Sequence, residues 1–411
     1  MAMSGAALTG HLDLRGGRPC WQGAPDGPPG SDPLPRETVD LAIVGAGVMG
    51  AMLAERLGAD GRTVAVLDRR PPAYGSTAAS TALVMWAADT PLTELSGSIG
   101  GPVAARRWRR VAQAVLDLDR LVAARGLACG WRARPELYLA GDRLDAAGLR
   151  READIRQRAG LSSVFAGAAD VAARFGISAR PALLSSGVFE VDPVALTLEL
   201  LRVARARNVS LTFPADVVSV ERRGDAIELT TAEGRSLRAR QAVLATGYEA
   251  PRPALPAAFG LSSSYAIATR PGVAPFWREN ALIWEAADPY LYARATTDGR
   301  LIFGGEDEAF AEASRRDALI AQKRATLETL ASRLLGGAPI VADCAWSATF
   351  GTSPDGHPAI GRSREIDGLW LAYGFGGNGV TFASLAAGLI AADMAGEPEP
   401  GAADFSPHRF G

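Results

Sequence analysis

A glycine-rich turn near the start of the chain has the residue types and spacing of a phosphate-binding loop. It spans Gly45–Gly50, reads GAGVMG, and lies between an apolar run and a segment with helical spacing. Gly45 permits a tight turn, Gly47 lets the backbone approach a pyrophosphate, and Gly50 allows the helix to pack closely on the strand. Asp68 ends the next apolar run, where it would accept hydrogen bonds from an adenosine ribose. The pattern predicts a dinucleotide site at the N-terminus of a helix.

The surroundings of the turn favour this interpretation over a chance glycine-rich loop. A strand precedes the turn, a helix follows it, and the acid has the required spacing. The motif alone does not distinguish FAD from a nicotinamide cofactor. A second glycine-rich segment, Gly374–Thr381, opens onto a helical run near the C-terminus. Its N–H groups and the positive end of the helix dipole suit an anionic group, although a turn that only caps a buried helix has the same letters.

Three segments together resemble the D-amino-acid oxidase and glycine/sarcosine oxidase family of FAD enzymes. They are Gly75–Leu83, Val243–Gly247 and Gly374–Thr381, and the similarity runs in order over residues 38–397. The resemblance implies an enzyme that oxidises a C–N bond of an amine or amino-acid-like substrate by hydride transfer to flavin N5. Such chemistry depends on orientation more than on a strong base. The electron acceptor is oxygen or another acceptor.

The resemblance also implies which residues contact FAD. The backbone of Val217 would hold the adenine, and Phe375–Thr381 would reach the isoalloxazine ring, where N–H groups raise its electron affinity. Positions that resemble known flavin attachment points are Ala79 and Ala348, so FAD is expected to bind non-covalently. The predicted cofactor-binding residues are Gly45, Gly47, Val48, Met49, Gly50, Asp68, Arg69, Ser76, Thr77, Thr81, Ala82, Leu83, Val217, Gly247, Phe375, Gly376, Gly377, Asn378, Gly379, Val380 and Thr381.

The predicted substrate residues are Tyr292, Arg294 and Phe350. Tyr290, Tyr292 and Arg294 alternate along a strand-like segment, so they share one face. We expect that face to line the substrate cavity, with Arg294 paired to a carboxylate, although a solvated sheet face explains the pattern equally well. By resemblance, Phe350 occupies the position of the arginine that grips the substrate carboxylate in amino-acid oxidases. An apolar or amine substrate, or a carboxylate bound by Arg294, remains open.

Other candidate residues have more ordinary explanations. Tyr265 and Trp346 are possible pocket aromatics, but core packing is the more frequent role. Asp355 and His357 are expected to shape a turn rather than to transfer protons. Lys323, the only lysine of the chain, has the spacing of an exposed helix face. The lysine that promotes the reaction with oxygen in sarcosine oxidases therefore has no evident counterpart.

Length and patterning predict an α/β protein with more than one domain. The 411 residues contain 48% hydrophobic residues, which is ample for a core. We predict an N-terminal arm over 1–35, a discontinuous Rossmann-like FAD-binding domain over 36–86, 187–255 and 346–411, and a substrate domain over 87–186 and 256–345. The second domain is expected to be α+β, with a mixed antiparallel sheet. Helical patterns dominate 87–186, and a long helix is predicted near 311–335.

Composition excludes several functional classes. Lysine and arginine total 43 against 45 acids, so no field favours nucleic acid or an anionic membrane, and the arginine run Arg106–Arg110 is expected to be a solvated helix face. One lysine and three histidines leave little material for Schiff-base chemistry, histidine metal sites or hydrolytic triads, and no metal site is predicted. Three scattered cysteines fit a reducing cytoplasm. The arm lacks the apolar core of a secretory signal, and the longest late apolar run, 382–394, is too short for a membrane span.

Three alternatives compete with the flavin oxidoreductase. A nicotinamide-dependent dehydrogenase would use the first glycine motif but leaves Gly374–Thr381 unexplained. A non-catalytic flavin-binding protein would show a blocked pocket beside Phe350. A tailoring enzyme of the same flavin family would act on a larger secondary amine or a nucleobase substituent.

Overall fold

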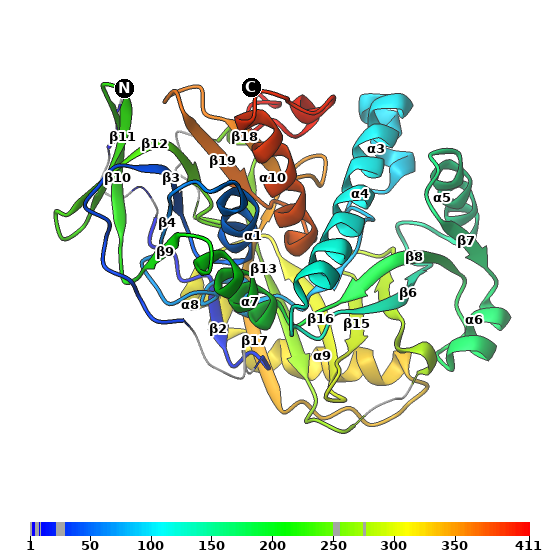
Figure 1. The fold of residues 1–411 in the computed structure, drawn as a ribbon. Helices are drawn as coiled ribbons and strands as arrows, with labels where there is room; N and C mark the ends of the chain where they lie inside the picture. Colours follow the sequence, from blue (N-terminus) through cyan, green and yellow to red (C-terminus); the bar gives the residue numbers. More distant parts are fainter. Residues whose placement is uncertain (1, 5–7, 9, 22–28, 250–254, 274–276) are drawn as a thin grey trace.

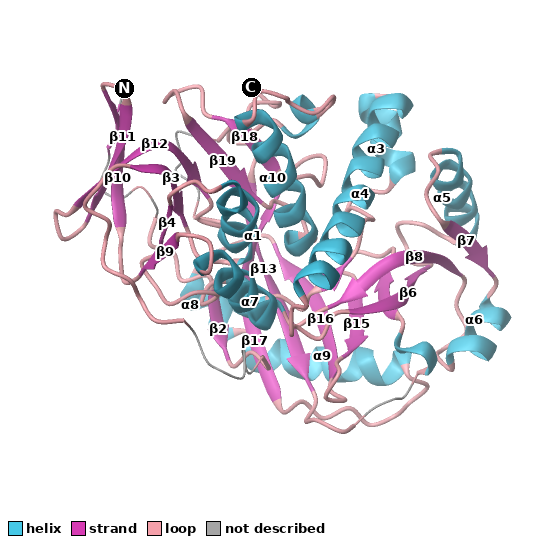
Figure 2. Cartoon of the chain, viewed as in Figure 1, coloured by secondary structure: helices cyan, strands magenta, loops and turns pink. Residues whose placement is uncertain are grey.

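The computed structural model describes residues 2–4, 8, 10–21, 29–249, 255–273 and 277–411. Within this part of the chain two sheets stand side by side, with helices between them and around them (Figures 1 and 2). The helices are α1 (Val48–Leu57), α2 (Ser76–Ala79), α3 (Leu92–Ile99), α4 (Gly101–Arg125), α5 (Ala146–Arg158), α6 (Ala168–Phe175), α7 (Pro193–Arg205), α8 (Ala313–Ala318), α9 (Ile320–Leu334) and α10 (Gly379–Met394). None of the helices in the described residues is both long and apolar enough to cross a membrane.

The first sheet has a parallel core of buried strands. Its strands are β1 (Ala2–Ser4), β3 (Val39–Val44), β4 (Val64–Leu67), β9 (Val209–Thr212), β10 (Val217–Arg223), β11 (Ala226–Thr231), β12 (Ser236–Leu244), β18 (Ala359–Arg362) and β19 (Leu369–Tyr373). The order β9-β4-β3-β12-β19 is parallel throughout, and β10 and β11 continue it as an antiparallel extension. Helices α1, α7 and α10 cover one face of the parallel core (Figure 1).

The second sheet is mixed and mostly antiparallel. Its strands are β2 (Arg15–Gly17), β5 (Leu83–Val84), β6 (Arg132–Leu139), β7 (Ser163–Ala166), β8 (Ala182–Glu190), β13 (Gly260–Ala268), β14 (Leu282–Glu285), β15 (Leu291–Ala295), β16 (Leu301–Glu308) and β17 (Cys344–Thr352). Only the β6–β14 pair among those described is parallel. Helix α9 packs on one face of β13, β16 and β17. The predicted fold class is confirmed.

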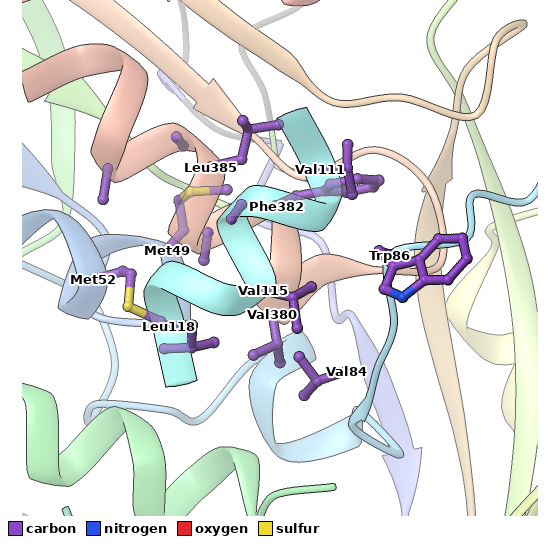
Figure 3. Packing of buried hydrophobic residues seen from close by; sticks show 14 of the residues in the cluster. Met49, Met52, Val84, Trp86, Val111, Val115, Leu118, Val380, Phe382 and Leu385 are labelled. Carbon is purple, nitrogen blue, oxygen red and sulfur yellow. The ribbon is translucent and has the colours of Figure 1, made fainter. Parts of the chain in front are cut away.

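A continuous apolar layer joins the two sheets. Figure 3 shows part of this layer, in which Met49 of α1, Val115 of α4 and Phe382 of α10 belong to one buried cluster with Val84 of β5 and with Trp86, which follows β5. The five side chains are almost completely buried. Because protein interiors are close-packed, this layer fixes how the sheets stand relative to each other.

The strand pairing differs from the predicted segment limits in three places. β17 pairs with β13 along residues 344–352, so the expected boundary at 346 falls inside a strand of the second sheet. The expectation of mostly helical structure in 87–186 missed β7 and the start of β8, which pairs with β6. The predicted long helix is interrupted at Leu319, where α8 ends and α9 follows. Short strands of the arm extend both sheets, so the arm packs on the protein.

The expected solvated face on α4 is wrong for Arg107. This side chain is 7% exposed, and its Nη1 lies 2.5 Å from Oδ2 of Asp355. Arg409 donates to both oxygens of the same carboxylate at 2.8 Å, and the two guanidinium groups hold the pKa of Asp355 down at about 2. Arg106 instead pairs with Asp404 at the surface. Asp355 therefore ties α4 to the C-terminal segment.

Replacement of Asp355 by alanine is expected to lower the free energy of unfolding by about 3–5 kcal/mol, because two buried guanidinium charges would lose their carboxylate. The matched control is Asp117→Ala on α4, which removes an exposed pair with Arg120 and should cost less than about 1 kcal/mol. Urea unfolding of both variants measures the difference. Equal losses would show that the Asp355 pairs contribute no more than a surface contact.

His357 is expected to make stability fall below neutral pH. Its ring is fully buried against Phe382 and Phe405, Nε2 has no partner, and burial lowers its pKa to about 4. Since the unfolded chain takes up the proton near pH 6.5, the native state loses about 2 kcal/mol between pH 7 and pH 5 through this group. The variant His357→Gln should lose that part of the pH dependence in urea unfolding. An unchanged slope would contradict the assignment.

Candidate functional site

The turn between β3 and α1 has no room for side chains at two of its glycines. Gly45 has φ 118°, and a Cβ there would lie 2.2 Å from the carbonyl oxygen of Ala245 on the neighbouring strand end. A Cβ on Gly50 would lie 1.8 Å from the carbonyl oxygen of Gly45. At Gly47, by contrast, a Cβ would approach only the hydroxyl of Thr77, at 3.1 Å. The close approach of helix and strand therefore requires glycine at 45 and 50.

Asp68 at the end of β4 holds the turn in place. Its Oδ2 accepts the N–H of Ala46 at 2.7 Å and its Oδ1 accepts the N–H of Arg70 at 2.8 Å. Burial raises the pKa of this carboxyl group. Each oxygen keeps a lone pair, so Asp68 can also accept from a ribose hydroxyl. Beside it, Arg69 and Arg70 pair with Glu249 at 2.5 and 3.1 Å.

A first cavity begins at this turn and follows the ends of β4 and β12. It contains about 1070 Å³ free of protein atoms, including space open to solvent. Leu14 of the arm and Tyr248 also line it. The predicted cofactor residues that line it are Gly45, Gly47, Val48, Met49, Asp68, Arg69, Ser76, Thr77, Val217, Gly247, Gly379 and Val380.

The residues of the first cavity fit an FAD molecule. Helix α1 begins there without a side-chain cap on its first turn, and its Val48 N–H meets only the hydroxyl of Thr77 at 3.0 Å. Ser76 has a buried hydroxyl without a partner. A helix N-terminus and an unpaired hydroxyl suit phosphate oxygens. Val217, whose backbone is expected to hold the adenine, also lines this cavity.

A second cavity adjoins the first, with about 900 Å³ free of protein atoms. Ser76, Ser80, Tyr248, Gly379 and Val380 line both, so the two spaces meet at the N-terminus of α10. Of the remaining predicted cofactor residues, those lining the second cavity are Thr81, Ala82, Leu83, Gly377 and Asn378. Its other lining residues are Ala79, Met85, Ala87, Asp89, Ser264, Trp284, Tyr290, Tyr292, Ala348, Thr349 and Phe350.

A family of known proteins matches most of the chain. The sequence profile of the family described as "FAD dependent oxidoreductase" matches residues 40–393. The chain belongs to that family. It is accordingly a flavoprotein oxidoreductase, an enzyme, as its sequence predicted.

Solved structures of low identity share the fold. Glycine oxidase from Geobacillus kaustophilus superposes with a TM-score of 0.72 at 20% identity, over 90% of this chain and 99% of that one. Iminodiacetate oxidase from Chelativorans sp. BNC1 gives 0.71 at 23% identity, over 89% and 98%. L-proline dehydrogenase from P. horikoshii gives 0.74 at 17% identity, over 91% and 98%. These proteins are named for different substrates, so the likeness concerns the fold alone.

A curated relative matches only a short segment. The tRNA 5-methylaminomethyl-2-thiouridine biosynthesis bifunctional protein MnmC of Albidiferax ferrireducens is 41% identical over 58 residues. That match covers 14% of this chain and 10% of the relative. It does not extend the relative's activity to this flavoprotein.

In the predicted flavin loop, residues 375–381, more backbone N–H groups are already hydrogen-bonded within the protein than the sequence suggested. Gly376 N–H donates to the carbonyl of Gly351 and Gly377 N–H donates to Asp89, both at 2.8 Å. Two expected free donors are therefore occupied. Phe375 packs against Tyr248 and Phe259 and lines neither cavity, and Gly50, Gly376 and Thr381 also lie outside the linings. The uncapped N-terminus of α10 remains at the junction.

Of the three predicted substrate residues, Tyr292 and Phe350 lie at the second cavity and Arg294 does not. The Arg294 side chain is 2% exposed, and its Nη1 donates to the carbonyls of Ala82 at 2.6 Å and Val191 at 2.9 Å. The alternation along β15 correctly placed Arg294 on the same face as Tyr292. Its long side chain, however, extends along that face and binds backbone carbonyls behind the cavity. This geometry disfavours its pairing with a substrate.

Three other candidates lie away from the cavity. Trp346 donates to the carbonyl of Ala79 at 2.9 Å and packs in the core. Tyr265 follows Ser264 on β13 and so points to the opposite face of the sheet. The predicted exposure of Lys323 is wrong: it is 8% exposed, lies over the Tyr265 ring, and pairs with Glu308 at 2.7 Å.

Sequence reasoning missed several residues of the second cavity. Tyr248 directly follows the predicted Gly247, and that adjacency was a usable signal. Asp89, Ser264 and Trp284 come from a loop and two strands that only the tertiary fold brings together. The aromatic wall is held from behind, because Trp284 donates to Glu136 at 2.7 Å.

Two alanine substitutions should separate folding from cofactor binding. In Gly47→Ala the new methyl group presses only on the Thr77 hydroxyl, which needs to shift by a few tenths of an ångström. The apoprotein should therefore unfold within about 1 kcal/mol of the wild type while FAD affinity falls about tenfold or more. Gly50→Ala forces the helix off the turn, so the apoprotein itself should lose about 3 kcal/mol. Urea unfolding without FAD and flavin titration measure the two quantities. Parallel losses in both variants would contradict this division.

Proposed function

We propose that this flavoenzyme oxidises a C–N bond of an amine or amino-acid-like substrate bound in the second cavity. The observation that carries the proposal is the junction of the two cavities. Ser76, Gly379 and Val380 line both spaces, so a cofactor lying along the first presents its flavin end to the second. FAD supplies an acceptor for a hydride from the carbon beside nitrogen, and the nitrogen loses a proton, so the product is an imine.

The side chains of the second cavity suit orientation rather than strong base catalysis. Tyr248, Tyr292, Trp284 and Phe350 provide aromatic walls that exclude water from a bound substrate. No histidine or lysine lines the cavity among the described residues. Holding the reacting carbon beside the flavin is therefore the main contribution expected of the protein.

We propose that FAD is held without a covalent bond. Ala79 and Ala348 line the second cavity at the positions that resemble attachment points, and neither offers a nucleophile. The three cysteines, Cys20, Cys129 and Cys344, are buried and line neither cavity. Burial raises the pKa of the Cys20 and Cys129 thiols to about 12, which keeps them protonated.

The two other classes of function are less well supported. Membership of the FAD-dependent family favours FAD over a nicotinamide cofactor. A non-catalytic flavin protein would have a blocked pocket beside Phe350, whereas an open cavity lies there. The tailoring alternative differs only in substrate size and is compatible with the same cavity.

Purified protein is expected to show flavin absorption that moves entirely into the supernatant after acid precipitation. A panel of amines and amino acids, added anaerobically, should include a member that bleaches the flavin, and admission of oxygen then distinguishes an oxidase from an enzyme with another acceptor. Flavin retained in the pellet would refute non-covalent binding. A protein that takes up no added FAD would refute the proposed function.

A further inference from the structure

The second cavity has an unusual charge for a site that accepts amino-acid-like molecules. Among its described lining residues, Asp89 is the only one with a formal charge, and arginine, lysine and histidine are absent. Asp89 accepts the N–H of Gly377 at 2.8 Å, and burial raises the pKa of its carboxyl group. The remaining lining is aromatic, apolar or hydroxyl-bearing.

A second carboxyl group stands directly behind this lining. Asp307 lies in a bulge of β16, where the pairing with β13 shifts between Tyr265 and Ser263 and Glu306 takes φ 59°. The hydroxyls of Ser264 and Tyr290, both of which line the cavity, lie close enough to Asp307 to stabilise its carboxylate. Its Oδ1 is buried and has no partner. Burial, reinforced by the charge of Asp89, raises the pKa of Asp307 to about 6.

The nearby cations are committed elsewhere. Lys323 pairs with Glu308 and Glu306, which flank Asp307, on the opposite face of the sheet. Arg143 pairs with Glu94 at 2.7 Å and donates to the backbone carbonyl of Asp89. Its charge lowers the pKa of the Asp89 carboxyl group, but burial outweighs this effect and the pKa stays raised. Arg294 is held by backbone carbonyls behind Ala82. The cavity therefore presents carboxyl groups that no basic side chain of the lining neutralises.

We propose that the substrate is an amine that binds as a cation and has no carboxylate beside its reacting C–N bond. This inference rests on the proposed function and narrows its substrate class. A carboxylate would meet Asp89 and Asp307 without a positive partner, which costs Coulomb energy and desolvation. An ammonium group gains from both acids and from the faces of Tyr290, Tyr292 and Trp284.

Phe350 also favours a cation over a carboxylate in the cavity. It lines the cavity at the position that resembles the carboxylate-binding arginine of amino-acid oxidases. An apolar ring there removes the guanidinium that would offset Asp89 and Asp307. Asp307 acts as a positioning residue, because it reaches the substrate through the hydroxyls of Tyr290 and Ser264.

Calorimetry on the FAD-loaded protein tests the inference without turnover. Benzyltrimethylammonium and benzoate share a phenyl ring and carry opposite charges. The cation should bind at least tenfold more tightly than benzoate. Asp307→Asn and Asp89→Asn should each weaken the cation about tenfold, a loss of about 1.4 kcal/mol. Asp225→Asn, at a carboxylate with 90% side-chain exposure, is the matched control and should change neither constant.

The variant Phe350→Arg should gain affinity for benzoate, a result that misfolding of the variant cannot produce. It should bind benzoate at least tenfold more tightly than the wild type and lose affinity for the cation. Benzoate binding that equals or exceeds cation binding in the wild type, or binding of neither ion, overturns the inference.

Anaerobic flavin reduction separates this inference from the proposed function. N-methylbenzylamine should reduce the flavin faster than N-methylphenylglycine, which adds only the carboxylate. Faster reduction by the amino acid overturns the inference and leaves the proposed function standing. If the cation binds preferentially but no amine or amino acid reduces the flavin, the proposed function fails and the charge selection stands.

Discussion

The apolar contact between α1, α4 and α10 is the constraint on which the site depends. Met49 lies in this layer and also lines the first cavity, and Val380 lies in it and lines both cavities. The same packing that joins the sheets therefore places the cofactor cavity against the substrate cavity. Because a well-packed layer resists small shifts, the relative position of the two spaces is set by hydrophobic burial and not by the ligands.

Around this junction the protein concentrates locally unfavourable features. Asp89 and Asp307 are half-buried carboxyl groups whose pKa burial raises, and Glu306 adopts a left-handed conformation in the bulge that holds Asp307. A buried carboxyl group costs stability unless a cation or donor compensates it. Such features persist where the surrounding structure over-determines them, and they concentrate at functional sites. Their position beside aromatic walls is the physical basis for expecting a cationic ligand there.

Most of the residues predicted to bind the cofactor line one of the two cavities, whereas the predicted substrate residues left out much of the lining of the second cavity. The β3–α1 turn, Asp68 and the start of α10 are each short segments of neighbouring residues. In such segments local geometry dictates the residue type, as at Gly45 and Gly50, so the sequence alone reveals them. The second cavity is assembled from β13, β14, β15 and a loop. The register of β13 against β16 depends on a bulge that the local sequence does not predict. Periodicity gave Tyr292 and Arg294 one face, but could not say how far along that face each side chain would reach. The sequence likewise predicted exposed helix faces for Arg107 and Lys323, whereas both side chains are buried with acidic partners.

Arginine illustrates how this chain separates structure from recognition. With a single lysine, nearly all its positive charge is carried by guanidinium groups, whose five donors suit multiple simultaneous partners. Arg294 uses them on backbone carbonyls behind the cavity, and Arg107 and Arg409 use them on Asp355, between α4 and the C-terminal segment. No guanidinium lines the second cavity among the described residues. Since a guanidinium is the usual partner of a carboxylate, confining it to structural positions shifts the preference of the cavity from amino acids towards amines.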